Sequence, residues 1–222
     1  MKRFFFLPSE VSYGLLGLTL LCLVKLNFEQ AFFILTMIFM VAFAFRRGNI
    51  PYRETLKPDG EIYISPVHGT VESIRQNVPI LNDSEIGHEV RISISIWDEK
   101  GLYLPTTGEV SYLKANKGKK IPRDAEPHVF YGPLDEVSHT DLVFTSKNQA
   151  KTLMRYVDGQ CCTRPTIWLK SGDRGRGAAC FGYYPFGGTL LIYLPKNSDL
   201  LVYEAERVKP GQTVIASIKD EK

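Results

Sequence analysis

The residues that could carry chemistry centre on a glycine pair in the apolar stretch YYPFGGTLLIYLP, residues 183–195. The centre of this stretch, Phe186, Gly187, Gly188 and Thr189, looks like a self-cleavage motif in which the reacting residue is missing. Glycine has no side chain, so Gly188 can neither attack a carbonyl nor eliminate to a ketone. The pair also has a structural interpretation, because Gly-Gly in a strand marks a bulge or a close approach of two backbones.

Basic residues form two groups that could bind an anionic headgroup. Arg174 and Arg176 lie among glycines shortly before the glycine pair, and each could hold a phosphate through two hydrogen bonds. The second group lies in residues 114–136, where several prolines predict an irregular loop. A lysine near an anionic membrane contributes ~1 kcal/mol to binding. Solvated loops would explain both groups equally well. The candidate lysines are Lys117, Lys119 and Lys120.

Hydrophobic residues with a period of two predict the strands that would position these groups. In EVRISISIWD, Val90, Ile92, Ile94 and Ile96 alternate with polar side chains, so these four apolar residues are expected to face a core. Further strands are expected in residues 61–74, which hold two strands about a turn, and in residues 189–195, 199–208 and 209–218.

Two local signals add detail to this pattern. The sequence KPGQ suits a type II turn, because Pro210 sets the first φ and Gly211 tolerates the positive second one. Residues 147–157, KNQAKTLMRYV, give a weak helical signal. The chain after residue 46 is therefore expected to be mainly β (a β-rich α+β domain), with short strands and glycine-rich corners.

The first 46 residues predict a hydrophobic membrane-anchoring hairpin. Residues 11–24 and 31–45 are two apolar runs, each shorter than the ~20 residues of a straight span. They would form either two tilted transmembrane spans or a re-entrant hairpin. Basic residues flank them, which places the following domain on the cytoplasmic side of the inner or plasma membrane. No cleavage site supports a signal peptide, and two buried helices are the alternative. The flanking residues are Lys2, Arg3, Arg46 and Arg47.

Composition argues for an ordinary folded domain and against two kinds of partner. The chain is 44% hydrophobic and 23% charged, which is typical of a folded protein. A net charge of +3 is too small to indicate a nucleic-acid partner. Four cysteines without CxxC spacing are expected to be free thiols. No metal is expected, because His88, His128 and His139 lack ligand spacing; each is a possible base but is expected in a surface loop.

Six stretches, in this order, resemble the phosphatidylserine decarboxylase family. They are AFRRGNIP, SPVHGTV, ISIWDEKGLYLPTTGEV, DGQCCTR, GDRGRGAACFGYYPFGGTLLIYLP and ERVKPGQTVIA. The last also resembles the β-hairpin shell of biotinyl and lipoyl carrier domains, which implies a C-terminal hammerhead-type β-hairpin element. The resemblance covers most of residues 43–218, with a gap around residues 114–150.

The resemblance implies a chemistry and the residues that should perform it. Members of the family decarboxylate the serine headgroup of a phospholipid with a pyruvoyl group made from their own chain, in which a serine attacks the preceding glycine carbonyl. An aspartate–histidine pair activates that serine. The resemblance places Gly188 at the serine, His68 at the aspartate and Lys100 at the histidine. All three are changed, whereas an engineered block on cleavage would need only Gly188.

The sequence therefore predicts two parts, a membrane hairpin over residues 1–46 and a phosphatidylserine decarboxylase-like domain over residues 47–222. The expected function is a membrane-associated protein that makes no pyruvoyl cofactor and binds phospholipid or a partner, either an active paralogue or a second copy. The alternative is an active decarboxylase that makes phosphatidylethanolamine through atypical processing between Gly188 and Thr189, so enzymatic activity stays open. A carrier-like adaptor is disfavoured, because no lysine lies at a Met-Lys-Met type tip.

Overall fold

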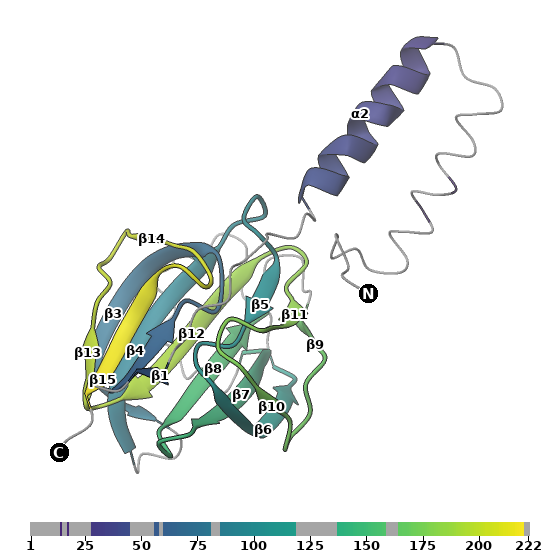
Figure 1. Cartoon of the computed structure of the whole chain (residues 1–222). Helices are drawn as coiled ribbons and strands as arrows, with labels where there is room; N and C mark the ends of the chain where they lie inside the picture. The colour runs from purple at the N-terminus through teal and green to yellow at the C-terminus, as the bar shows by residue number, and fades with distance from the viewer. Residues whose placement is uncertain are drawn as a thin grey trace.

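A β-rich body with a projecting helix makes up the described part of the chain (Figure 1). The computed structural model describes residues 14, 17, 28–44, 56–57, 60–80, 85–118, 137–158 and 164–219. The elements are α2 (Phe28–Ala44), β1 (Leu56–Lys57), β2 (Gly60–Ile64), β3 (Gly69–Ile80), β4 (Glu85–Ile94), β5 (Gly101–Tyr103), β6 (Gly108–Asn116), β7 (His139–Ser146), β8 (Lys151–Val157), β9 (Thr166–Ile167), β10 (Arg174–Gly175), β11 (Cys180–Tyr183), β12 (Gly188–Pro195), β13 (Ser198–Leu200), β14 (Arg207–Val208) and β15 (Val214–Lys219).

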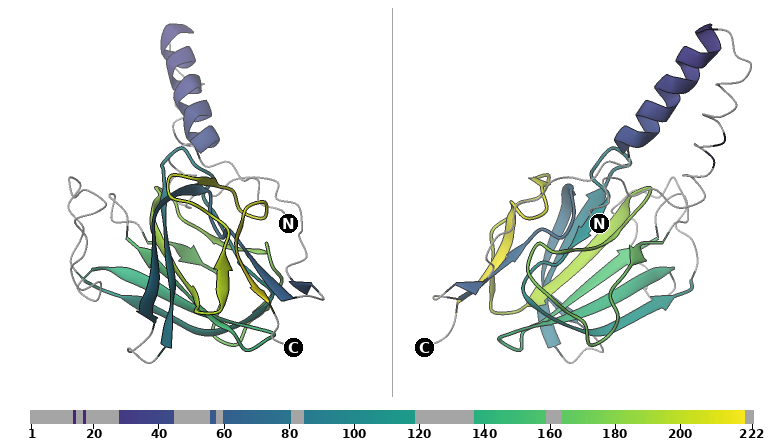
Figure 2. Two further views of the ribbon diagram at one scale, coloured as in Figure 1. Left: turned by 90° about the vertical axis from the view of Figure 1, so that its left-hand side faces the viewer. Right: turned by 45° about the vertical axis from the view of Figure 1, so that its right-hand side comes forward.

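The strands form three antiparallel sheets. The largest has eight strands in the order β10-β6-β7-β8-β12-β4-β3-β14. A four-stranded sheet has the order β1-β2-β15-β13, and a three-stranded sheet has the order β5-β11-β9. One cluster of buried side chains draws on all three sheets, so the two small sheets share a core with one face of the large sheet (Figure 2). This architecture confirms the mainly β fold class.

Strand β12, which begins at the glycine pair, is an inner strand between β4 and β8. Leu190, Ile192 and Leu194 enter the main core, whereas Leu191 and Tyr193 enter a second cluster on the other face. A strand that is buried on both faces needs an unbroken apolar run, which explains the sequence LLIYL. The predicted strand over residues 189–195 is confirmed.

The alternation in residues 89–98 is confirmed for its first three apolar positions only. Val90, Ile92 and Ile94 are buried in β4, but the strand ends at Ile94. Ile96 is 45% exposed, so the prediction that it faces the core is wrong. The chain turns at Ser95, where the Asp98 amide donates to the Ser95 carbonyl at 3.1 Å. The alternation of apolar and polar residues therefore does not predict which side chains are buried after the strand ends at this turn.

The local signals had different outcomes. Gly211 has φ +70°, as a type II turn requires, and the Gln212 amide donates to the Lys209 carbonyl at 3.3 Å. After this turn, β15 pairs with both β2 and β13. The weak helical signal over residues 147–157 is wrong, because residues 151–157 form strand β8, which pairs with β7 on one side and with β12 on the other.

The basic segment and the hydrophobic N-terminus are only partly described. Residues 114–116 belong to β6, so the irregular loop does not begin at residue 114, and residues 119–136 lie outside the described residues. Helix α2 covers most of the second apolar run. The first run lies outside the described residues apart from Gly14 and Gly17. Among the residues that the structure describes, no helix is long and apolar enough to cross a membrane.

Candidate functional site

The glycine pair lies at a tight corner where the chain enters β12. Gly187 has φ +78° and Gly188 has φ +152°, and L-residues with side chains rarely adopt either value. A Cβ atom at residue 187 would overlap the carbonyl oxygen of Ile94 on the adjacent strand β4. The close approach of two backbones, which the sequence offered as a structural explanation, therefore exists at this pair.

The space that a side chain at residue 188 would need is filled by Tyr184. A Cβ atom at Gly188 would overlap the Tyr184 hydroxyl, which is buried and donates a hydrogen bond to the Val157 carbonyl oxygen. The Tyr184 ring also packs edge-on against Tyr156, with ring centroids 6.3 Å apart. Several contacts therefore fix the tyrosine where a reactive side chain of residue 188 would have to stand.

The peptide bond after Gly188 belongs to the regular ladder of β12. Gly188 is opposite Ile94 of β4, and Thr189 is opposite both Ser93 of β4 and Val157 of β8. Paired backbone groups on both sides hold this bond in extended geometry. Attack by the Thr189 hydroxyl on the Gly188 carbonyl would require this part of the ladder to open.

Lys100 is buried beside the glycine corner. Its side chain is 1% exposed, and its Nζ donates to the Ser95 carbonyl oxygen at 2.7 Å. Its own carbonyl oxygen accepts from the Tyr184 amide at 2.8 Å. Lys100 is therefore not a solvated surface charge, although it lies between two acidic residues and a glycine in the sequence. Burial lowers its pKa to about 8, although the nearby Asp98 carboxylate acts in the opposite direction.

His68 faces a carboxylate that sequence reasoning overlooked. Its Nε2 lies 3.9 Å from Oδ1 of Asp98, and its Nδ1 lies 3.4 Å from the Glu99 amide nitrogen. Asp98 is 4% exposed; it accepts from the Ser95 amide at 2.8 Å and from the Arg207 guanidinium at 2.5 Å. The sequence signal for Asp98 was weak, because it follows the expected strand among other charges.

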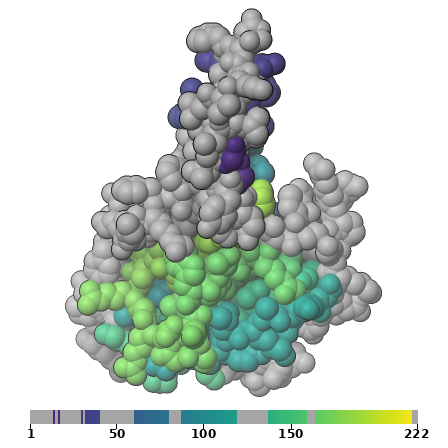
Figure 3. Space-filling view, turned by 90° about the vertical axis from the view of Figure 1, so that its right-hand side faces the viewer, coloured from purple at the N-terminus to yellow at the C-terminus, as the bar shows by residue number. Residues whose placement is uncertain are grey.

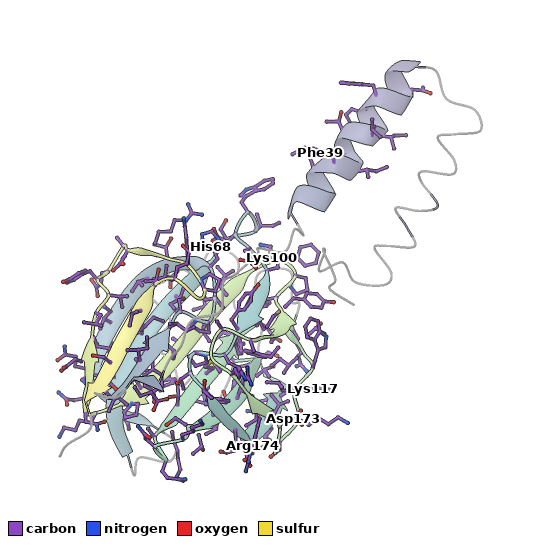
Figure 4. All side chains as sticks on the ribbon, in the orientation of Figure 1. Phe39, His68, Lys100, Lys117, Asp173 and Arg174 are labelled. Atoms are coloured by element: carbon purple, nitrogen blue, oxygen red, sulfur yellow. The ribbon has the colours of Figure 1, made fainter. Side chains whose placement is uncertain are left out.

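The fold brings together all three residues that the resemblance singled out. His68 precedes β3, Lys100 precedes β5 and Gly188 begins β12. Gly188 is opposite Ile94, the Lys100 amine bonds to the next residue, Ser95, and His68 faces Asp98, which accepts from the Ser95 amide. Figure 4 shows His68 and Lys100 at the end of the β-rich body that is nearer α2. We call His68, Asp98, Lys100 and the glycine pair the glycine-corner site.

The two arginines proposed as lipid ligands do not join this site. Arg174 forms β10 with Gly175 and pairs with β6, so it lies in a short strand and not in a loop. It is 84% exposed and donates to Glu109 at 2.8 Å. Figure 4 shows Arg174 far from Lys100. The closeness of Arg174 to the glycine pair in the sequence does not predict closeness in space, because β10 is the edge strand of the large sheet and β12 is an inner strand.

Arg174 and Arg176 instead line a hollow of about 830 Å³ on the side of β6 and β10. Lys147 and Lys151 also line it, with Glu109 opposing their charge. Figure 3 shows the neighbouring face, where teal atoms and the green atoms of the segment after residue 164 form one surface below α2. Lys117 directly follows β6, whereas Lys119 and Lys120 lie outside the described residues.

The other histidines do not contribute to the glycine-corner site. His88 lies in β4 and its Nε2 is 3.0 Å from the Lys196 carbonyl oxygen. His139 lies in β7, is 2% exposed and has Nδ1 2.6 Å from the Val137 carbonyl oxygen. The expectation of surface-loop histidines is wrong for both of these strand residues. His128 lies outside the described residues.

The glycine-corner site thus holds groups that move protons and bind charge but has no hydroxyl or thiol at residue 188. An imidazole, a carboxylate and an amine are present in His68, Asp98 and Lys100. Self-processing also needs a nucleophile within reach of a backbone carbonyl. Asp98 and Lys100 are nearly inaccessible to solvent, so the partly exposed His68 and the exposed Arg207 side chain are the groups that a charged ligand could reach without rearrangement.

Comparison with known proteins identifies the relatives of the chain. It is 29% identical over 199 residues to the phosphatidylserine decarboxylase proenzyme of Carboxydothermus hydrogenoformans, covering 87% of each chain. It is 23% identical over 199 residues to the proenzyme of Parabacteroides distasonis, covering 86% of this chain and 84% of the relative. With the proenzyme of Amoebophilus asiaticus it shares 29% identity over 167 residues, which is 72% of this chain and 69% of the relative.

Two other comparisons gave no match. No family model matches the chain, and no solved structure matches it. The similarity to the decarboxylase proenzymes nevertheless extends over most of the sequence. The chain is therefore a relative of the phosphatidylserine decarboxylase family.

Proposed function

We propose that this chain is a membrane-associated phosphatidylserine decarboxylase-like protein that makes no pyruvoyl group and binds phospholipid instead of decarboxylating it. The observation that carries the proposal is the position of Tyr184. Its hydroxyl occupies the space next to Gly188 where the side chain of a processing residue would have to lie.

On the proposed function, the chain has lost self-cleavage through more than the replacement of one serine. If only the serine had been lost, the space for its side chain would be empty and the rest of the processing site would be intact. Here the neighbouring side chain fills that place, and Gly187 and Gly188 both adopt positive φ values that suit glycine. His68 and Lys100 replace the residue types that the family resemblance implies for activation of the serine. The packing has thus become specific for glycine.

The exposed apolar surface of α2 supports membrane association. Phe32 and Phe33 are each 66% exposed, and Phe39 is 71% exposed. Large aromatic side chains in such numbers on one short helix favour contact with lipid or protein over contact with water. Basic residues at both ends of the hydrophobic region, Arg3 and Arg46 among them, support a cytoplasmic position for the β-rich body.

The exposed Arg207 side chain near the glycine corner supports an anionic phospholipid as the ligand. The Arg207 side chain is 63% exposed and its guanidinium bonds to Oδ1 of Asp98, the same oxygen that His68 faces at 3.9 Å. A guanidinium of this kind can bind phosphate or carboxylate with two parallel hydrogen bonds. The relatives are named for phosphatidylserine, which makes its headgroup the first one to test.

Vesicle binding tests the proposal. The full-length protein should co-sediment with vesicles that contain phosphatidylserine more strongly than with vesicles that contain phosphatidylglycerol at the same charge density. It should release no carbon dioxide from carboxyl-labelled phosphatidylserine. Equal binding to both lipids would reject headgroup recognition, and binding to neither would reject membrane association.

Release of carbon dioxide would establish the alternative function, an active decarboxylase processed between Gly188 and Thr189. Recruitment to membranes only after an active paralogue or another protein is added would favour a partner function over direct lipid binding. The three possible functions, which are lipid binding, decarboxylation and binding of a partner protein, therefore give different results in this experiment.

A further inference from the structure

The turn between β4 and β5, residues 95–100, exposes two consecutive large apolar side chains. Ile96 is 45% exposed and Trp97 is 59% exposed. Among the described residues of the β-rich body, no other two consecutive large hydrophobic residues are both exposed. Their exposure is unusual because Val90, Ile92 and Ile94 of the preceding strand are all buried.

Buried polar groups hold the turn in this shape. The Asp98 carboxylate accepts from the Ser95 amide at 2.8 Å, and the Lys100 amine donates to the Ser95 carbonyl at 2.7 Å. Both Asp98 and Lys100 are nearly inaccessible to solvent. The exposure of Ile96 and Trp97 is therefore imposed by the fold, and a partner that covers them would not have to order a flexible loop.

The turn points in the same direction as the apolar helix. In Figures 1 and 2 it projects from the end of the β-rich body that lies nearest to the C-terminal end of α2. The helix carries exposed Phe39 in its second half. The guanidinium of Arg207, bonded to Asp98, adds an exposed cation beside the turn.

We propose that Ile96 and Trp97 insert into the interfacial layer of a phospholipid membrane, as a second point of attachment beside α2. The proposal rests on the proposed membrane association. Tryptophan is favoured at the boundary between headgroups and acyl chains, because its ring is apolar and its N–H can bond to headgroups. The exposed cation complements lipid phosphate at the same depth. Insertion would hold the glycine-corner site against the headgroup layer.

The two tryptophans of the chain, Trp97 and Trp168, allow a direct optical test. The full-length Trp168→Phe variant reports on Trp97 alone, and the Trp97→Phe variant reports on Trp168 alone. Trp168 is a matched probe because it is 43% exposed in the protein alone and follows β9, away from the turn (Figure 1). Vesicles of phosphatidylcholine and phosphatidylserine, with or without brominated acyl chains, serve as the membrane.

We expect Trp97 emission to shift to shorter wavelength on vesicle binding and to be quenched by brominated chains, while Trp168 emission does neither. Trp97→Ser should weaken vesicle binding roughly 10-fold or more, whereas Trp168→Ser should leave it unchanged. Co-sedimentation is read in the same samples. Bound protein with unquenched Trp97 would overturn the insertion while leaving the proposed function intact. Protein that does not sediment would overturn both.

Discussion

Replacing Gly188 with serine is expected to leave the chain uncut and to lower the free energy of unfolding by roughly 3–5 kcal/mol. The serine would restore the nucleophile that the family resemblance implies. It would also place a Cβ atom against the Tyr184 hydroxyl and force a side-chain residue into φ +152°. Both effects oppose the folded state. Chemical denaturation measures the stability, and intact mass measures cleavage.

Two further variants separate the cost of the positive φ from the cost of the overlap with Tyr184. Gly172 also has positive φ, +92°, but a Cβ atom there would meet no atom within 4 Å, so Gly172→Ala should cost only about 1 kcal/mol. Combining Gly188→Ser with Tyr184→Leu should cost less than the sum of the single changes, because the smaller side chain removes the overlap. Cleavage in the single Gly188→Ser variant would contradict the account of a corner closed by Tyr184.

Replacing Lys100 with methionine should raise the free energy of unfolding at pH 7 by roughly 1–3 kcal/mol. In the folded protein burial lowers the pKa of Lys100 to about 8, from 10.5 in a solvated lysine. At pH 7 the amine is protonated in both states, and the folded state bears the cost of the buried charge. Methionine has a similar shape without charge, and the Ser95 carbonyl keeps its bond from the Asp98 amide.

The pH dependence of this difference provides the control. As pH rises from 8 to 10.5 the folded protein releases the Lys100 proton before the unfolded chain does, so the wild-type protein gains stability relative to the variant. The difference should shrink by roughly 2–3 kcal/mol between pH 7 and pH 11. Lys196→Met, at an exposed lysine, should show no such change. A Lys100→Met effect that is constant across this range would contradict a buried, charged amine.

If Lys100 lowers stability as expected, position 100 serves function more than folding. Stability is often reduced at sites where charged groups face a ligand. In this chain Lys100, Asp98 and His68 gather at the one corner where Gly188 replaces the expected nucleophile. On the proposed function, these residues border the headgroup-binding site.

The sequence predicted the strands well where alternation or an apolar run was long. It predicted β4 as far as Ile94, and it predicted β12 from its unbroken apolar run. It failed at Ile96, because the turn at Ser95 is fixed by side chains of residues that lie later in the chain. It also failed for β8, whose position between β7 and β12 outweighs a weak local helical preference.

The sequence predicted which residues belong to the glycine-corner site, but it did not predict their burial or their contacts. The family resemblance named His68, Lys100 and Gly188, and the fold places them at one corner. Neither the burial of Lys100 nor the contribution of Tyr184 could be read from spacing, since both depend on how β5 and β12 pack. Arg174 was predicted to lie near Gly188 because the two are close in the sequence, but in the structure Arg174 lies far from the glycine-corner site.

The intact mass of the full-length protein, extracted from membranes, tests the central claim most directly. A chain that does not process itself should give one species at the 25.1 kDa of the printed sequence, with an unmodified backbone at the glycine pair. Two species would contradict this, if the smaller one spans residues 189–222 and begins with a keto group in place of an amine. Such a result would show that the Gly188–Thr189 bond is cut despite its place in the β12 ladder.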